Sequence, residues 1–292
     1  MAIFAKTAEL GSFRGAARQL GLSPSVVSHH VALLERQLST ALLHRSTRRV
    51  TLTEAGQRLF LAARTMVSAA ESGLSDLKDS AGRLSGQLSL AAPAGLLSSP
   101  LADGIAAFAK GHPSVELRMH FSDAPVDLVR DGIDVAFRAG TLKDSALKSK
   151  RILSFDRALV ASPEYVSLRI EPRAPEDLSD WDWIRLQSRP PRATFCSGSL
   201  PPRVVDYRSR IVVDAAEAML QLSIRGLGLA TVPCWMAHPH LVAGALVEVL
   251  PKWRLESPMI YALWPATAPR RSLGQRLIEF LAEHVAMKPP RR

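Results

Sequence analysis

Several features that mark common enzyme, secreted and membrane proteins are scarce or missing in this sequence. Its 292 residues include two cysteines, Cys196 and Cys234, which show no metal-like spacing and cannot build a disulfide framework. They are either two reduced, buried thiols or a redox-sensing pair, and the distance between them separates these alternatives. No run of 18 clean apolar residues occurs, so a membrane span is not expected.

Catalytic and targeting signals are also missing. The sequence has no GxSxG elbow, Walker loop, HExxH motif or cysteine-based zinc signature. We therefore expect no catalytic activity, no cofactor and no metal site. The segment MAIFAKTAELGSF lacks the basic start, long apolar stretch and cleavage site of a signal peptide, so we expect a cytoplasmic protein without a membrane partner.

Positive charge, in contrast, is plentiful and unevenly distributed. The chain carries a formal net charge of +10, and residues 1–64 hold nine basic against three acidic residues, a surplus of six. A basic lobe on a nearly balanced body is typical of a module that binds phosphate groups. This distribution favours a nucleic acid as the partner.

The basic lobe has the spacing of a helix-turn-helix. Two short helices are predicted before residue 21, with Ser12 as the cap of the second. Ala17, Gly21 and Val27 then supply a small residue, a turn glycine and a buried branched residue. This order permits two helices to approach closely across a tight turn.

The next helix is predicted to start at Ser23, which can cap it, and Pro24, which suits its first position. Its buried side is expected to consist of Val27, Val31 and Leu34. The outer side carries hydroxyl and imidazole groups, which can reach base edges and phosphates in a major groove. The DNA contacts predicted here are Ser23, Pro24, Ser25, Ser28, His29 and His30. Adjacent helix residues point about 100° apart, so the two histidines are not expected to share a metal ion.

A basic wing and a long helix follow. The stretch LLHRSTRRVTLT predicts a β-hairpin that turns at Ser46–Thr47. Three arginines would lie along DNA phosphates, namely Arg45, Arg48 and Arg49. A helix of roughly 45 Å is then predicted from Thr53 to about Leu84. Its narrow apolar seam consists of Leu59, Ala63, Met66, Ala70, Leu74 and Leu77. The seam favours pairing with the same helix of a second subunit, and packing on the chain's own C-terminal domain is the alternative.

The segment GSFRGAARQLGLSPSVVSHHVALLERQLSTALLHRSTRRVTLTEAG, residues 11–56, resembles the LysR-type family of bacterial transcriptional regulators. The resemblance implies a winged helix-turn-helix over residues 1–53, a dimerising linker helix over 54–85, and an effector-binding domain over 86–292 shaped like periplasmic binding proteins. It implies a homodimer or homotetramer that binds double-stranded DNA, with RNA polymerase as a further candidate partner. Four residues depart from the family's usual pattern, namely Arg14, His29, Ser39 (usually Gly) and Leu43 (usually Phe).

The C-terminal body alternates between strand and helix patterns, which predicts an α/β domain with a largely parallel sheet. Helices are expected near residues 94–110 and at the start of 126–140, and a strand is expected to end at Arg138. The resemblance implies two lobes joined by two crossings. Lobe I would span about 87–161 plus 266–292, and lobe II about 162–265.

An unidentified small-molecule effector is expected between the lobes, because ligands in such sheets bind at the carboxyl ends of strands and at helix N-termini. The predicted contacts are Ala94, Gly95, Leu96, Ser122, Arg138, Gly140, Ser162, Thr194, Asp214 and Ala215. Arg138 would pair with a carboxylate effector, or it is a surface or salt-bridged arginine. Residues 94–96 offer no hydroxyl where many relatives have Ser or Thr, so the cleft is either apolar or binds its effector differently.

Two other classes of function are the alternatives to a DNA-binding regulator. A solute-binding protein would need export, and no signal is visible in the sequence. A DNA-associated enzyme would need a catalytic constellation, which the sequence does not contain. Both alternatives are therefore weaker than a DNA-binding regulator.

Overall fold

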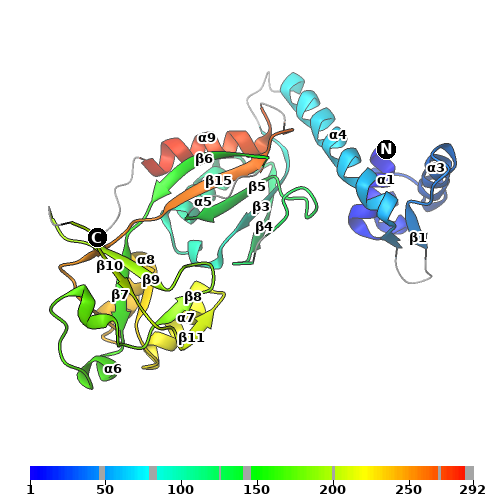
Figure 1. Ribbon diagram of the computed structural model, residues 1–292. Helices are drawn as coiled ribbons and strands as arrows, with labels where there is room; N and C mark the ends of the chain where they lie inside the picture. Colours follow the sequence, from blue (N-terminus) through cyan, green and yellow to red (C-terminus); the bar gives the residue numbers. More distant parts are fainter. Residues whose placement is uncertain are drawn as a thin grey trace.

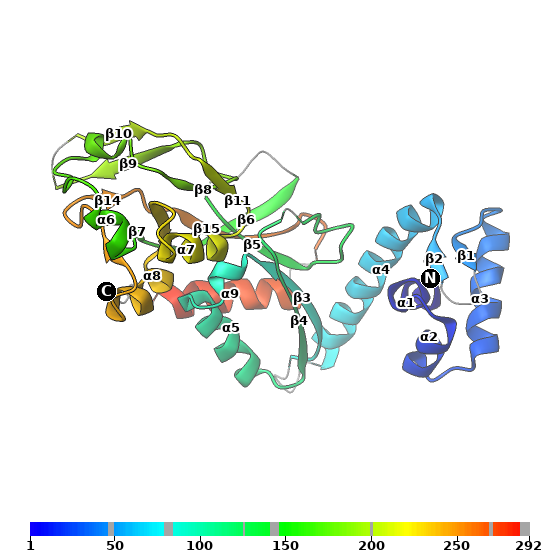
Figure 2. The same cartoon turned by 90° about the horizontal axis from the view of Figure 1, so that it is seen from below.

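The computed structural model describes residues 1–45, 50–78, 84–124, 126–140, 146–198, 201–268 and 271–286. A helical head is joined through a long helix to a larger two-lobed body (Figure 1). A view from below places lobe I next to the long helix and lobe II farther away (Figure 2). None of the described helices is both long and apolar enough to cross a bilayer.

The head consists of three helices and a two-stranded wing. Its elements are α1 (Ala2–Leu10), α2 (Phe13–Leu20), α3 (Pro24–Gln37), β1 (Leu43–Arg45) and β2 (Val50–Leu52). Ser12 caps α2 by accepting a hydrogen bond from the backbone N–H of Gly15 at 3.1 Å. Gly21 ends α2 with a φ of 65°, a conformation that glycine adopts without strain. Both the predicted cap and the predicted turn are confirmed.

The long helix α4 (Glu54–Lys78) begins where the sequence predicts it. The Thr53 hydroxyl oxygen accepts a hydrogen bond from the Gly56 N–H at 2.9 Å. Gly56 is required here, because an added Cβ would overlap the carbonyl oxygen of Leu42. The wing therefore lies directly against the first turn of α4.

The apolar seam of α4 is buried near the start of the helix and exposed farther along. Its first part packs in the head's own core, where Ala63 is fully buried and Leu59 packs beside it. Farther along, Met66 is 50% exposed and Ala70 is exposed. The side chains of Leu74 and Leu77 lie outside the described residues.

Lobe I is built on one five-stranded sheet with the order β4-β3-β5-β15-β6. Its strands are β3 (Gly86–Ala92), β4 (Val115–Phe121), β5 (Val135–Ala139), β6 (Leu147–Ser154) and β15 (Met259–Pro265). The helices α5 (Pro100–Gly111) and α9 (Leu273–Ala286) share its main core. Strands β4, β3 and β5 run parallel, but β15 is antiparallel to both of its neighbours. The sheet is thus mixed, because β15 returns from lobe II in the opposite direction.

Two predicted helices of lobe I differ from the structure. The helix expected over 94–110 is split into a short 3-10 turn, η2 (Ala94–Leu96), and α5, which starts after Ser99. The helix expected at the start of 126–140 is replaced by turns. A carboxylate oxygen of Asp127 accepts hydrogen bonds from the N–H groups of Val129 and Arg130. These bonds resemble a helix N-cap, but Gly132, with a φ of 75°, ends the segment after a single turn.

Lobe II contains three small sheets, with strand orders β12-β7-β13, β11-β8 and β10-β9-β14. Their strands are β7 (Arg157–Ala161), β8 (Ile184–Leu186), β9 (Arg192–Cys196), β10 (Arg203–Asp206), β11 (Ile211–Val213), β12 (Ala230–Pro233), β13 (Val247–Glu248) and β14 (Arg254–Leu255). The helical segments are α6 (Pro163–Ser167), η3 (Pro175–Leu178), α7 (Ala216–Ile224) and α8 (Cys234–Val242).

The strand pairing places both crossings between the lobes a few residues earlier in the chain than predicted. β7 pairs with β12 and β13 of lobe II, and β15 pairs with β5 and β6 of lobe I. The first crossing therefore lies just before Arg157, not after residue 161. The second lies just before Met259, not after residue 265. At these crossings the side chains of Asp156 and Ser257 are hydrogen-bonded at 2.7 Å.

Candidate DNA interface and effector site

Helix α3, on which the DNA contacts are predicted (the recognition helix), packs against the head through apolar residues on one side. Val27 and Val31 are fully buried, and Leu34 packs against the same head core. At the start of the helix, the Ser23 hydroxyl oxygen accepts a hydrogen bond from the Val26 N–H at 3.3 Å and is paired with the Ser25 hydroxyl at 2.8 Å. The cap thus fixes the N-terminal turn of α3, and the predicted buried side is confirmed.

The opposite side of α3 is open to solvent. Ser25 and His29 are exposed, and Ser28 is partly exposed. Residues at this spacing share one helix face. The head therefore presents hydroxyl and imidazole groups on one outward surface.

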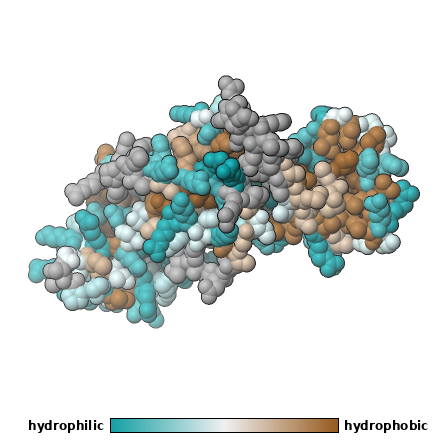
Figure 3. Space-filling view, turned by 90° about the horizontal axis from the view of Figure 1, so that it is seen from above, coloured by the Kyte–Doolittle hydropathy of each residue, from teal (hydrophilic) through white to brown (hydrophobic). Residues whose placement is uncertain are grey.

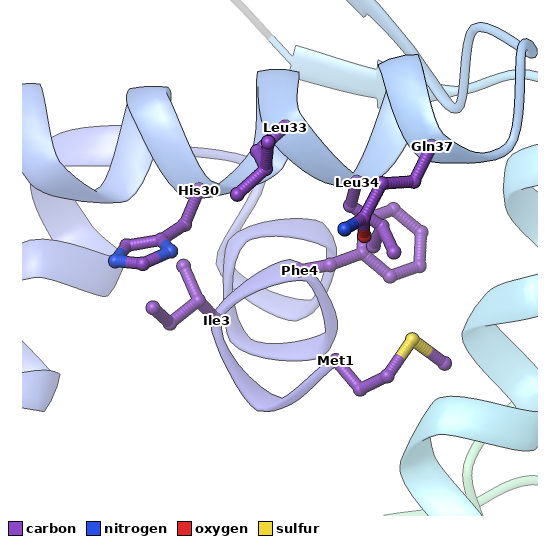
Figure 4. Close-up of a pocket in the computed structure, with 7 residues that line it drawn as sticks. All are labelled: Met1, Ile3, Phe4, His30, Leu33, Leu34 and Gln37. Atoms are coloured by element: carbon purple, nitrogen blue, oxygen red, sulfur yellow. The ribbon is translucent and has the colours of Figure 1, made fainter.

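His30 does not share that surface. It lines a hollow of about 150 Å³ between α3 and α1, together with Met1, Ile3, Phe4, Leu33, Leu34 and Gln37. Its ring lies beside Ile3 (Figure 4). One position along a helix rotates a side chain by about 100°, which separates His30 from His29. His30 is nevertheless exposed, and its contact with DNA stays a prediction.

The wing is described only in part. β1 and β2 are antiparallel, with Arg45 opposite Val50. Arg48 and Arg49 lie outside the described residues, as does the predicted turn at Ser46–Thr47. The same holds for the side chain of Arg45, so the phosphate contacts of the wing stay a prediction.

Glu35 is a structural residue of the head that the sequence did not single out. Its carboxylate accepts hydrogen bonds from the N–H groups of Leu42 and Leu43, at 2.9 and 3.1 Å. A carboxylate in the last half of a helix opposes the helix dipole. That unfavourable position is a signal that Glu35 needs a partner elsewhere.

The effector residues predicted in lobe I lie mainly at one edge of its sheet. Ala94, Ser122 and Gly140 follow β3, β4 and β5, which are parallel, so these residues meet at the carboxyl ends of the strands. In lobe II, β8 runs parallel to β11, and Trp183 forms a parallel bridge with Leu229 just before β12. The carboxyl ends of β8, β11 and β12 therefore also share one edge.

A single carboxylate joins these two edges. One oxygen of Asp123 accepts a hydrogen bond from the Ala94 N–H of lobe I at 3.1 Å. The other accepts from the Ala216 N–H of lobe II at 3.2 Å, at the start of α7. Ala215, at the cap position of α7, makes no side-chain cap. Asp123 supplies this cap from the other lobe, next to the predicted Ser122.

The loop at 94–96 is in direct contact with lobe II. The Gly95 carbonyl oxygen accepts a hydrogen bond from the Trp235 indole N–H at 2.9 Å. An added Cβ on Gly95 would lie 3.1 Å from the Met236 sulfur, and Leu96 is buried in the core of lobe I. The loop at 94–96 therefore packs directly against the start of α8 in lobe II.

Several other predicted effector residues have structural partners. The Arg138 guanidinium donates to the Val126 carbonyl at 3.2 Å. The Ser122 hydroxyl oxygen accepts from the Ala124 N–H. Ser162 caps α6 by accepting from the Tyr165 N–H, and because β7 runs away from the crossing, Ser162 lies at the far end of this strand. These bonds fix the positions of the three side chains, and their contact with an effector stays a prediction.

The remaining predicted residues flank the lobe II edge or the crossings. Gly140 has a φ of 95° and donates to the Met259 carbonyl. Asp214 is exposed just before α7. Thr194 lies in β9, and its carbonyl accepts a hydrogen bond from the Glu256 N–H at 3.3 Å. Thr194 therefore adjoins the second crossing.

Two half-buried arginines lie at the same edge and were not predicted. Arg157 donates from Nε and Nη2 to the Glu256 carbonyl, at 3.1 and 2.8 Å. Arg189 donates from Nη1 to the carbonyl and hydroxyl oxygens of Thr231, both at 3.1 Å. Tyr207 follows β10, and its ring stacks on Trp183 at 4.0 Å between centroids.

Burial and the charges of neighbouring groups shift the pKa values of Arg157, Arg189 and Tyr207. Burial, with a smaller contribution from the charge of Arg157, lowers the pKa of Arg189 to about 10. Burial also lowers the pKa of Arg157, against the exposed Glu256 carboxylate, which raises it. Burial raises the pKa of Tyr207, while three neighbouring guanidinium groups, those of Arg189, Arg185 and Arg157, act in the opposite direction.

Together, a helix-turn-helix head with an open polar recognition face and a body of two lobes define a DNA-binding regulator with a ligand-responsive domain. Residues 1–57 match the bacterial regulatory helix-turn-helix protein, lysR family, and residues 81–286 match the LysR substrate binding domain. The chain belongs to the LysR-type family of transcriptional regulators, and its relatives are regulators rather than enzymes.

Individual relatives agree over nearly the whole chain. The HTH-type transcriptional regulator PtxR of Pseudomonas aeruginosa is 35% identical over 98% of this chain and 92% of its own length. The full-length Vibrio cholerae virulence activator AphB is 25% identical, with a TM-score of 0.57 over 97% of this chain and 96% of that one. ArgP of Mycobacterium tuberculosis shares the fold, with a TM-score of 0.63 at 19% identity over 98% and 96% of the two chains.

Proposed function

We propose that this regulator reads its operator with the outward face of α3, and that a small molecule bound between the lobes changes the placement of its DNA-binding heads. The observation that carries the DNA part is the solvent-exposed face of Ser25, Ser28 and His29 on a helix whose other side is fully buried. Serine and histidine side chains on such a face can bond to base edges. Arg48 and Arg49 on the wing would add phosphate contacts.

We further propose that the active form is a homodimer or homotetramer. Met66 and Ala70 are exposed on α4 beyond the part of the seam that packs in the head. Hydrophobic residues also gather on the surface of the head (Figure 3), where Leu33 and Met1 are among the exposed apolar side chains. A second copy would cover these residues and set two recognition helices against successive major grooves.

Asp123 supports the effector part of this proposal. It is a bridge between the lobes that consists of two hydrogen bonds to backbone amides. A ligand that binds differently to the bridged and unbridged arrangements would shift the balance between them. The protein would act in the cytoplasm on DNA, where it can also contact RNA polymerase.

Substitutions on two faces of α3 test the DNA part. Ser28→Ala combined with His29→Ala should weaken binding to the operator about ten-fold or more, because each good base contact contributes about 1–3 kcal/mol. Binding to an unrelated duplex should change little. The matched control is His30→Ala, on the α1-facing side, which should stay within about two-fold of the wild type.

The measurement is fluorescence anisotropy on the DNA upstream of the chain's own gene and on an unrelated duplex of equal length. An equal loss on both duplexes would assign Ser28 and His29 to phosphate contacts. A larger effect of His30→Ala than of the double variant would place the recognition face on the wrong side of α3.

A further inference from the structure

The edge of lobe II where β8, β11 and β12 end carries two different groups of residues. One part is the start of α7, where the Asp123 carboxylate of lobe I already bonds to the Ala216 N–H. The other part is the cluster of Arg157, Arg189 and Tyr207. At the start of α7 the anion is therefore the chain's own Asp123. The arginine cluster, in contrast, carries positive charge and faces no buried anion among the described residues.

The two guanidinium groups are fixed in place by neutral backbone partners. Arg157 is held by the Glu256 carbonyl at the second crossing, and Arg189 by Thr231 of β12. Neither partner carries a formal charge at the bonding oxygen, so these bonds orient the arginines without neutralising them. Glu256 is the acidic residue that faces Arg157, and its side chain is exposed.

Arg185 keeps Arg189 in position. Its guanidinium donates to the Arg189 carbonyl at 2.6 Å and to the Ser209 hydroxyl at 3.2 Å. The Arg185 side chain therefore fixes the turn that follows β8. Arg189 consequently projects over β12 from a fixed turn, with Nε and Nη2 unbonded among the described residues.

Tyr207 provides the third group. Its ring is stacked on Trp183, which is itself buried, so the ring position is set. The hydroxyl has no hydrogen-bond partner among the residues that the structure describes, and the charges of Arg189, Arg185 and Arg157 all act on it. A guanidinium group with free donors can bind a carboxylate in a planar, bidentate way, and a nearby hydroxyl can donate one further hydrogen bond.

We propose that Arg157, Arg189 and the Tyr207 hydroxyl form an anion site at the cleft-facing end of lobe II, which takes the carboxylate of a small organic acid. This inference rests on the proposed function, because it names the class of effector that the two-lobed domain senses. It places the carboxylate on lobe II, whereas the sequence predicts Arg138 of lobe I as the partner of a carboxylate effector. Two partly buried like charges repel each other, and an anion between them would relieve that repulsion.

The test is the thermal midpoint and the calorimetric affinity of the full chain in acetate, malonate, phosphate and chloride at equal ionic strength. Acetate and malonate should raise the midpoint above its value in chloride. Arg189→Gln should weaken malonate binding at least about ten-fold, since a hydrogen bond to a charged group contributes about 1.5–3 kcal/mol. Tyr207→Phe keeps the stacked ring and should weaken binding by a smaller factor.

Two controls keep the result interpretable. Arg192→Gln removes an exposed arginine of the same lobe, paired with Asp206, and should leave the malonate response unchanged. Arg189→Lys keeps the charge and should retain part of the response even where Arg189→Gln folds poorly. Each variant is compared with its own midpoint in chloride.

Equal midpoints in all four salts, or an Arg189→Gln protein that responds like the wild type, would overturn the proposal. A response to phosphate without one to acetate or malonate would overturn the carboxylate assignment. Duplex binding measured on the same samples reports separately on the proposed function, since loss of DNA binding would leave the anion titration unaffected.

Discussion

At the scale of single residues, carboxylates that accept backbone hydrogen bonds hold distant segments together. Glu35 joins the end of the recognition helix to the wing, and Asp123 joins the two lobes. In each case an acidic side chain satisfies two N–H groups. Such charge-assisted bonds are stronger than neutral ones, so both residues contribute more to the assembled structure than their surface charge suggests.

Cys234 gives a prediction about pH. Burial, helped by the nearby Asp156 and Glu248 carboxylates, raises the pKa of the Cys234 thiol to about 11 from an ordinary 9.0. At pH 9 the folded thiol should therefore be about one per cent thiolate, against about half in the unfolded chain. Alkylation of Cys234 by iodoacetamide in a Cys196→Ser variant should be far slower in the folded than in the unfolded protein.

The same shift links Cys234 to stability. The folded state keeps the thiol proton between about pH 9 and 11, where the unfolded state loses it, so this group lowers stability as pH rises through that window. Equal alkylation rates for the folded and unfolded chains at pH 9 would contradict the account. A protonated thiol is a poor nucleophile, which favours the reading of Cys234 as a structural thiol over a redox-sensing one.

At the scale of elements, the turn after α3 shows what one departure from the family pattern costs. Ser39 stands where the family usually has glycine, and its φ is 48°. Side chains with a Cβ adopt this left-handed conformation at a cost of about 1–2 kcal/mol. The chain therefore carries local strain between its recognition helix and its wing.

We predict that Ser39→Gly stabilises this turn by about 0.5–1 kcal/mol, after allowing for the greater freedom of glycine in the unfolded chain. Amide hydrogen exchange in α3 and the wing should slow by about two- to five-fold. Ser39→Ala keeps a Cβ and should bring no gain. Faster exchange in the glycine variant would show that Ser39 is not strained.

The elements of the head were predictable because local signals and burial agree there. Ser12, Gly21 and Ser23 act as the caps and turn that their types indicate, and Val27 and Val31 are buried. The lobe elements were less predictable. The segment from residue 126 forms a single turn instead of a helix, because Gly132 adopts a φ of 75° soon after the cap at Asp127.

At the scale of the whole molecule, the candidate effector site depends on contacts that no local pattern encodes. The loop at 94–96 lies at the carboxyl end of β3, as the strand pattern predicts, and it is bonded to Trp235 and Asp123, which are distant from it in the sequence. Arg189 and Arg157 are separated by 32 positions and meet only because β8, β12 and β7 lie side by side. The edge was predictable from strand order, whereas its occupants were not.

Asp123→Ala should loosen the connection between the lobes. Without the carboxylate, the Ala216 N–H at the start of α7 loses its partner from lobe I. Hydrogen exchange in a peptide covering residues 214–220 should accelerate about ten-fold or more, as expected for a lost hydrogen bond to a charged group. Mass spectrometry of the exchanged full chain provides the measurement.

Asp127→Asn is the matched control for this experiment. Asp127 lies in the same lobe, and among the described residues its side chain accepts hydrogen bonds only within its own turn, so exchange near α7 should not change. Unaltered exchange at residues 214–220 in Asp123→Ala would mean that the bridge does not hold the lobes together.

The central claim is that the head of this chain docks α3 into duplex DNA as part of a symmetric assembly. A hydroxyl-radical footprint of the purified full chain on the DNA upstream of its own gene tests it most directly. The account predicts protected patches one helical turn, or whole multiples of it, apart, and progressive loss of protection as salt is raised. A uniform cleavage pattern at low salt, with every duplex left unprotected, would contradict it.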